Sequence, residues 1–266
     1  MHAAPHWFIR TAGLTGIVAF TLTACAPAPN TDLLIERVLS ARLAATDPAI
    51  ADLLTRHVEE LDAEMLRLCG GECRTAADSP TPEASLAEVA ETILVSAPTL
   101  TDSSVPLVAR HYVELALVSP TPPAPLPLTT TTEASVDAAN ALAWHRAADY
   151  ILGTAASLLS GAEADAAETL RAYHRDILTE LDPIAADTTV APAGYEFTTD
   201  QPTALAVQAQ TVAWWMNRAA EAHGDWRAYC INAAGRAAAA ARPMLVLTGM
   251  SPSEAGFPVN DSAPEQ

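Results

Sequence analysis

Residues 119–127 constrain the fold of this chain more than any other segment, because five of the nine are proline. Proline lacks the backbone N–H that a helix interior and a central strand both need. The segment should therefore run extended, as a polyproline linker. We expect a linker over residues 119–130 that joins a helical unit at 32–118 to a second one at 131–248.

Composition favours helices in both units. Half of the residues are apolar, but aromatic residues make up only 5% of the chain. Much of the apolar half is alanine, which has the highest helix propensity and is poor in strands. We therefore predict an all-α fold.

Local signals place the individual helices. Asp47 and Pro48 suit the N-cap and the first position of one of them, and a glycine pair at 70–71 should end it. Together the signals predict four helices in each unit, at about 32–46, 48–70, 82–96 and 104–118, then 131–159, 161–182, 202–224 and 225–241, with an irregular tail at 249–266.

Capping patterns support the helices of the second unit. Thr130 with Glu133, and Ser160 with Glu163, have the spacing of capping boxes. Asp225 should cap the last helix of this unit. These patterns predict where three of its helices begin.

The first residues have the features of an export signal. An apolar run at about 13–20 precedes Leu22-Thr23-Ala24-Cys25, which resembles a bacterial lipobox, whose cysteine receives a diacylglyceryl group. The run is shorter than the roughly 20 apolar residues that span a bilayer. We expect a cleaved signal peptide at 1–24, acyl chains on Cys25 and a short tether at 25–31. The mature protein would be exported and held on the extracytoplasmic face of the cell membrane.

Charge excludes several classes of function. The formal net charge is -18, which disfavours nucleic acid and anionic head groups as partners.

Missing residues and motifs exclude several classes of enzyme. The chain has no lysine, so it can form neither a lysine Schiff base nor a P-loop. It also lacks the G-x-S-x-G, H-E-x-x-H and G-x-G-x-x-G motifs. The sequence identifies no catalytic residues and no cofactor.

Three cysteines remain once Cys25 is assigned to lipid. Cys69 and Cys73 flank the two glycines where a helix should end, and a reversal of the chain there would allow a disulfide between them. A bridge from Cys230 to one of that pair is the alternative. A zinc site would need further Cys or His nearby at ligand spacing.

The second unit resembles a known family. It contains Ala143-Trp144-His145-Arg146-Ala147-Ala148-Asp149-Tyr150, then Tyr173-His174-Arg175, a loop with Tyr195 and Phe197, Asp200 and Pro202, and Gly256-Phe257-Pro258. These residues resemble a ferritin-like domain family of unknown function, found in exported proteins and lipoproteins of actinobacteria. The resemblance covers about residues 131–258 and implies a ferritin-like four-helix bundle. A glutamate often precedes the histidine in that family, where this chain has Trp144.

Helical spacing predicts a polar cluster inside the bundle. His145 and Asp149 lie four residues apart on an otherwise apolar stripe. Tyr173 belongs to the apolar stripe of the next helix, and His174 lies on its flank. If the two helices form a hairpin about residues 160–161, His145 lies level with His174, and Asp149 lies level with Tyr173.

Two interpretations of this cluster lead to two functions. Ferritin-like di-iron centres take Glu from two helices and Glu-x-x-His from the other two. Here the stripes of the third and fourth helices offer no carboxylate, and a single Asp149 cannot balance two iron charges. A buried structural network, with a binding or scaffold role at the cell envelope, is therefore the first hypothesis. The alternative is a metal-binding or redox protein that uses His145, Asp149 and His174.

Three further residues draw attention. His57 and His111 lie on apolar stripes of the first unit, each with a glutamate three residues later, which reverses the Glu-x-x-His order. We interpret both as core or boundary residues. Trp214 points away from the core stripe of its helix, so it should pack on the first unit or serve as an exposed anchor for a partner.

Overall fold

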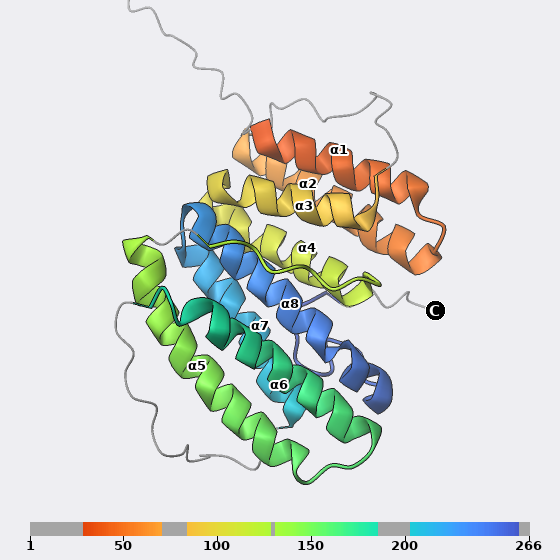
Figure 1. Ribbon diagram of the computed structural model, residues 1–266. Helices are drawn as coiled ribbons and strands as arrows, with labels where there is room; N and C mark the ends of the chain where they lie inside the picture. Colours follow the sequence, from red (N-terminus) through yellow and green to blue (C-terminus); the bar gives the residue numbers. More distant parts are fainter. Residues whose placement is uncertain (1–28, 71–83, 129–130, 186–202, 261–266) are drawn as a thin grey trace, which may run out of the picture.

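The computed structural model describes residues 29–70, 84–128, 131–185 and 203–260, and every regular element in these ranges is helical (Figure 1). The prediction of an all-α fold is confirmed for this part of the chain. The first unit contains α1 (Pro29–Ala44), α2 (Pro48–Leu68), α3 (Leu86–Ser96) and α4 (Val105–Val118), with short 3₁₀ turns at Ala97–Thr99 and Asp102–Ser104. The second contains α5 (Thr132–Ala156), α6 (Ala162–Leu181), α7 (Ala204–Glu221) and α8 (Gly224–Thr248). None of the helices described is both long and apolar enough to cross a membrane.

Several helix starts differ from those predicted. The capping box of the third helix is formed by Ser85 and Glu88, so α3 begins after the predicted position. Thr131 caps α5 with its side chain, whereas Thr130 lies outside the described residues. The Ser160–Glu163 box does not form, because Gly161 is the N-cap of α6, with a positive φ of 59° and no side-chain cap.

The last helix also differs from the prediction. Its N-cap is His223, so Asp225 lies in the first turn, and it continues beyond Ala241 although it contains Pro243. Proline has no N–H to donate to the carbonyl of Ala239, four residues earlier. The Nε of Arg242 donates to that carbonyl over 3.2 Å, which satisfies the acceptor and allows the helix to continue.

The four helices of each unit follow the same order of up and down directions. The starts of α6 and α7 lie beside the ends of α5 and α8, because Glu163, Leu205, Leu159 and Met244 line one pocket. In the first unit the starts of α2 and α3 lie beside the end of α1. Glu114 of α4 bonds Arg56 and His57 of α2, whereas Ser104, just before α4, bonds Glu64 further along α2, so the two helices run antiparallel. Each unit therefore runs up, down, down, up.

The two units share one buried core, which passes through α4 and α8. These helices run parallel (Figure 1), and at their contact a Cβ added to Gly235 would lie 2.3 Å from the ring of Tyr112. The Tyr112 hydroxyl accepts a hydrogen bond from Nδ2 of Asn232, which also donates to the carbonyl of Ala124. The proline segment is thereby tied to both units.

Candidate functional site

Two of the predicted residues meet at the centre of the second unit. The Nδ1 atoms of His145 on α5 and His174 on α6 lie 2.8 Å apart, and both side chains are fully buried. The network continues to α7, where Nε2 of His174 lies 3.1 Å from Oε1 of Gln208. Nε2 of Gln208 then donates to the carbonyl of Ala237 on α8 over 2.8 Å. A single line of hydrogen bonds thus joins all four helices.

This network assigns the protons on both rings. Because the Gln208 amide donates to a carbonyl, its Oε1 must accept, so His174 carries its proton on Nε2. Neutral His174 then accepts at Nδ1, and His145 donates from Nδ1. Burial holds the pKa of His174 down to about 4, and burial together with His174 and Arg236 holds the pKa of His145 well below its usual value. Both rings are therefore neutral near pH 7, and the His145 Nε2 lone pair has no hydrogen-bond partner.

Aromatic rings enclose the histidine pair. The Tyr173 ring meets both imidazoles edge-on, with centroid distances of 5.7 Å and 5.1 Å. Its hydroxyl donates to the carbonyl of Ala233 over 3.0 Å, and burial raises its pKa. The ring of Trp215 on α7 lies 5.5 Å from that of His145. The centre of the bundle is thus neutral, aromatic and closely packed.

Asp149 does not join this cluster, contrary to the prediction. Its Oδ1 accepts from Nε of Arg171 at 3.1 Å and lies 3.2 Å from Nε of Arg175. The side chain is 25% exposed. Four residues of an α-helix turn through about 400°, so Asp149 is rotated about 40° from His145. This rotation moves it to the edge of the buried stripe, where two arginines one turn apart on α6 hold it.

The other carboxylate near the centre is also held by arginine. Glu180 accepts two hydrogen bonds from Arg236, at 2.7 and 2.8 Å, and one from the hydroxyl of Tyr229. Within the described ranges no three His, Cys, Asp or Glu side chains gather in a way that could hold a metal ion. Neutral imidazoles beside carboxylates already paired with guanidinium groups lack the negative charge that a di-iron site needs.

A second buried histidine pair lies in the first unit. The rings of His57 on α2 and His111 on α4 stack, with centroids 3.8 Å apart. Each Nε2 reaches a glutamate of the opposite helix, since His57 lies 2.7 Å from Glu114 and His111 lies 2.5 Å from Glu60. The sequence carries a signal for this exchange that spacing within one helix did not reveal. The pattern Arg-His-x-x-Glu occurs twice, at 56–60 and 110–114.

The arginines of the repeated pattern complete the exchange. Arg56 bonds both oxygens of Glu114 at 3.1 Å, and Arg110 bonds Glu60 at 2.6 Å. Asn260 spans the two carboxylates, donating its backbone N–H to Glu114 and its side-chain amide to Glu60. Two carboxylates, two guanidinium groups and two imidazoles therefore form a charge-balanced unit.

Burial and pairing shift the pKa values in this unit. The hydrogen bond from His111 lowers the pKa of Glu60 to about 2. Burial raises the pKa of Glu114, but His57, the Asn260 N–H and Arg56 outweigh it, so the net shift is downward. Burial lowers the pKa of His111 to about 4 and also lowers that of His57. The neutral imidazoles donate to ionised carboxylates, which is a stable arrangement near neutral pH.

The remaining sequence predictions have mixed outcomes. Cys69 is disulfide-bonded and Cys230 is a buried free thiol, so the alternative bridge to Cys230 is absent. Cys73 and the lipobox cysteine, Cys25, lie outside the described residues. Trp214 is half-buried and stacks on Trp144 of α5 at a centroid distance of 6.2 Å, so it packs within its own bundle rather than on the first unit.

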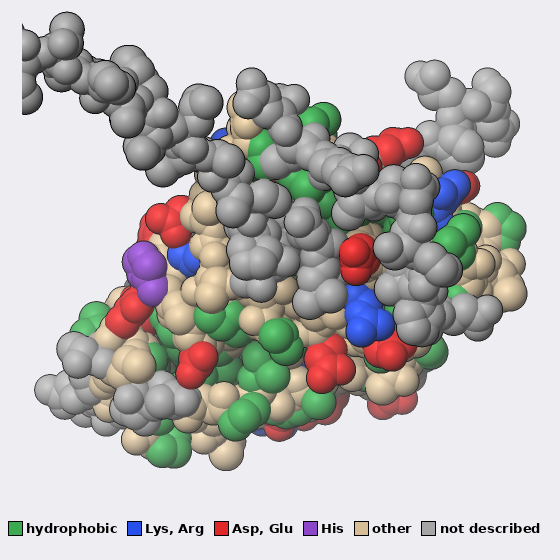
Figure 2. All heavy atoms as spheres, turned by 90° about the horizontal axis from the view of Figure 1, so that it is seen from above, with side chains coloured by type: hydrophobic (Ala, Val, Ile, Leu, Met, Phe, Trp, Pro, Cys, Tyr) green, Lys and Arg blue, Asp and Glu red, His purple; other side chains and the backbone are tan. Residues whose placement is uncertain are grey.

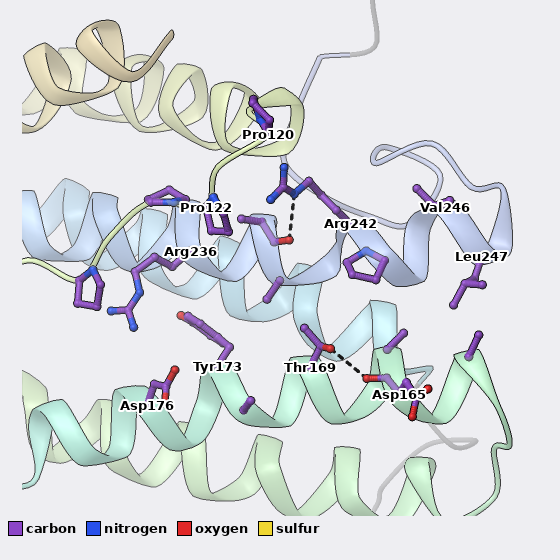
Figure 3. Close-up of a pocket in the computed structure, with 18 residues that line it drawn as sticks. Pro120, Pro122, Asp165, Thr169, Tyr173, Asp176, Arg236, Arg242, Val246 and Leu247 are labelled. Carbon is purple, nitrogen blue, oxygen red and sulfur yellow. Dashed lines mark hydrogen bonds between the residues drawn. The ribbon is translucent and has the colours of Figure 1, made fainter.

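An open groove lies on the outside of the second unit, between α6 and α8, with the proline segment along one edge (Figure 3). Its volume is about 930 Å³. Alanines of both helices face it, so short side chains leave the space unfilled. Tyr173 points from α6 towards α8 at its base (Figure 3). The groove therefore ends on the ring that packs against the buried histidines.

The charges around the groove are not equally available. Arg236 is held by Glu180, and Arg242 donates to the carbonyls of Ser119 and Ala239. Asp165 and Asp176 on α6 are exposed. The surface that the groove offers to a partner is thus apolar, with two exposed carboxylates on α6 and the half-buried guanidinium of Arg242 on α8, whose carbonyl partners do not neutralise its charge.

Comparison of the chain with protein-family models, with curated proteins and with solved structures found no match.

Proposed function

We propose that this protein is a lipid-anchored binding protein of the cell envelope, built on a ferritin-like bundle that serves as a scaffold. The lipobox ending at Cys25 supports export and anchoring on the extracytoplasmic face. The up-down-down-up order of α5–α8 supports the ferritin-like topology, in which the second and third helices run parallel and need a long connection.

One observation carries the scaffold role. At the centre of the second bundle, where a ferritin-like enzyme gathers carboxylates, the chain places the neutral network of His145, His174 and Gln208. That network ends on a backbone carbonyl and is enclosed by aromatic rings. Such an arrangement links four helices and fixes their packing, because every shared proton has a defined donor and acceptor.

The groove between α6 and α8 supplies the binding surface. Its exposed carboxylates, Asp165 and Asp176, outnumber the one guanidinium without a carboxylate partner there, Arg242, and the whole chain carries a formal charge of -18. On the face shown in Figure 2, acidic side chains are scattered among apolar ones. Charge complementarity therefore favours a basic segment of an envelope protein as the partner and disfavours nucleic acid. Apolar side chains of that segment would contact the alanines and prolines of the groove.

The metal-binding alternative has one observation in its favour. The His145 Nε2 lone pair is buried and has no hydrogen-bond partner. Neutral imidazole nitrogen is a common metal ligand. The alternative predicts that His145 and His174 bind iron, manganese or zinc without help from Asp149, which Arg171 and Arg175 hold elsewhere.

Two measurements test the proposal. Purified protein is exposed to Fe²⁺, Mn²⁺ and Zn²⁺ without chelators, desalted and analysed for metal. We expect none at stoichiometric level. Stoichiometric metal that is lost in His145→Asn and His174→Asn would overturn the scaffold role. Cys25→Ala should move the protein out of the membrane fraction, and unchanged membrane partitioning would refute the anchor.

The binding surface is tested on intact cells with a photo-cross-linker at Thr169 in the groove and at Val136, an exposed residue of α5 away from it. We expect one discrete adduct from Thr169 only, and we expect Asp165→Arg with Asp176→Arg to abolish it. An adduct that survives both reversals, or that forms equally from Val136, would argue against the groove.

A further inference from the structure

A separate apolar pocket lies at the end of the second bundle where α5 and α8 finish and α6 and α7 begin. Its volume is about 460 Å³, within the range of roughly 300–1,000 Å³ found for small-molecule sites. Its apolar lining includes Ile151, Leu158, Leu159, Leu205, Met244 and Met250. All four helices of the bundle and the turns beside them contribute, so the wall of the pocket is built by the bundle itself.

The hydroxyl groups in the wall are already engaged. Thr154 donates to the carbonyl of Tyr150 over 3.1 Å, and Thr248 donates to that of Met244 over 2.9 Å. The Thr203 hydroxyl accepts from the N–H of Ala206 in capping α7. Because two of these hydroxyls donate within the bundle and the third caps a helix, the pocket recognises a ligand mainly by apolar contact and shape.

Exposed apolar side chains gather at the same end of the molecule. Leu158 is 69% exposed and Met250 is 38% exposed, and both line the pocket. Val246 and Leu247, on the last turns of α8, are also exposed and lie where the groove reaches this end (Figure 3). Single exposed apolar residues are ordinary, but a group around an apolar pocket marks a binding site.

Charge limits the class of ligand. Among the described residues that line the pocket, Glu163 is the charged one. Glu163 and Asp165 both lie in the first turn of α6, so they already complement the positive end of that helix. An anionic head group at the mouth would meet these carboxylates and the negative charge of the chain.

From this pocket we propose a binding site for the alkyl chain of a single-chain amphiphile with an uncharged or cationic head group. The chain fills the apolar space, and the head lies at the mouth beside Glu163. This inference does not depend on the lipid anchor or on a protein partner at the groove, so its failure would leave both tests above unaffected.

The binding experiment uses residues 25–266 with Cys25→Ser, which keeps every described residue and needs no detergent. The probe is N-phenyl-1-naphthylamine, whose fluorescence rises in an apolar site. Decanol, decyltrimethylammonium and decanoate, each below its micelle concentration, then compete for it. We expect the first two to displace the probe and decanoate to compete at least about tenfold less well. Equal competition by decanoate would refute the charge selection.

Chain length provides a second readout. Each added methylene from hexanol to decanol should strengthen competition about fourfold while the chain still fits. The gain should stop once the pocket is full, because longer chains protrude into water. A gain that continues unchanged to the longest chains would indicate surface partitioning and would overturn the pocket.

Matched variants locate the site. Leu158→Glu places a charge at the mouth of the pocket, and Leu43→Glu makes the same change at a residue of α1 that is 77% exposed. We expect Leu158→Glu to weaken probe binding about tenfold and Leu43→Glu to leave it unchanged. Ala155→Phe, which fills the pocket from α5, should also reduce binding. Equal binding by all three variants and the parent would contradict the proposal.

Discussion

The rings of His57 and His111 stack 3.8 Å apart at the centre of the first unit, and each donates to a glutamate on the other's helix. Protonation of either ring would place a positive charge against its neighbour. Burial is the largest cause of the lowered pKa of both rings, and it keeps the pair neutral near pH 7. This relationship makes the first unit sensitive to acid.

We expect the free energy of unfolding to fall as pH decreases from 6.5 to about 4. The folded-state pKa of His111 is about 4, below the ordinary 6.5, so the unfolded chain binds a proton in this window that the folded chain does not. His111 alone accounts for roughly 3 kcal/mol over the window. Urea unfolding at half-unit pH steps measures the slope, which His111→Gln should reduce.

His223→Gln is the matched control for this prediction, because His223 is 70% exposed. The free energy of unfolding of His223→Gln should change with pH at the same slope as that of the parent protein. A further loss of stability should follow below pH 4.5, where the unfolded chain takes up protons that Glu60, with a pKa of about 2, does not. A stability that is flat between pH 6.5 and 4 would contradict the buried neutral pair.

Gly235→Ala should destabilise the protein by about 1–3 kcal/mol. The added Cβ would lie 2.3 Å from Cε1 of Tyr112, so α4 and α8 would have to separate. Gly153→Ala is the control, since its Cβ would meet only the flexible guanidinium end of Arg171, at 3.2 Å. Thermal unfolding should show a lower Tm for the first variant only, and equal changes in both would count against the close α4–α8 contact.

Gln208→Leu should cost about 1–3 kcal/mol, because it leaves the His174 Nε2–H and the Ala237 carbonyl unpaired in the core. Asp149→Ala should cost less than about 1 kcal/mol, because its ion pairs with Arg171 and Arg175 are partly exposed. Chemical denaturation of both variants gives the comparison. A larger loss of stability for Asp149→Ala than for Gln208→Leu would show that the Asp149 carboxylate stabilises the core.

The two glutamates of the first unit should respond unequally to neutralisation. Glu114 is 4% exposed and bonds His57, Arg56 and the Asn260 N–H, whereas Glu60 is 24% exposed. Glu114→Gln should therefore lower the Tm more than Glu60→Gln, since it leaves a more deeply buried set of donors without their charge partner. Differential scanning calorimetry tests this order, and the reverse order would be inconsistent with the burial of Glu114.

Local pattern predicted much of the fold but only part of the site. Apolar spacing predicted that His145, His174 and Tyr173 meet inside the second bundle, since a stripe repeats along one helix face. It placed Asp149 there as well, because a 40° rotation from the stripe is too small to resolve without the neighbouring Arg171 on α6.

The repeated Arg-His-x-x-Glu pattern marks the residues of the exchange between His57 and Glu114, but it does not show that each histidine bonds the glutamate of the other helix. This exchange depends on the antiparallel register of α2 and α4, which is set by how the helices pack. Helix starts were similarly uncertain by a few residues, because neighbouring Ser, Thr and Gly residues compete for each cap. The Ser160–Glu163 capping box does not form, because Gly161 takes the N-cap position and its positive φ turns the chain there.

Cys230 is unpaired and lies fully buried on α8, and burial raises the pKa of its thiol well above the ordinary value. Thiolate is the reactive form, so this sulfur should resist oxidation and disulfide exchange while the bundle is closed. Its rate of reaction with a water-soluble thiol reagent would then record how often α8 opens. Cys230 is therefore a natural reporter of local unfolding, on the helix of the second unit that packs against α4 of the first.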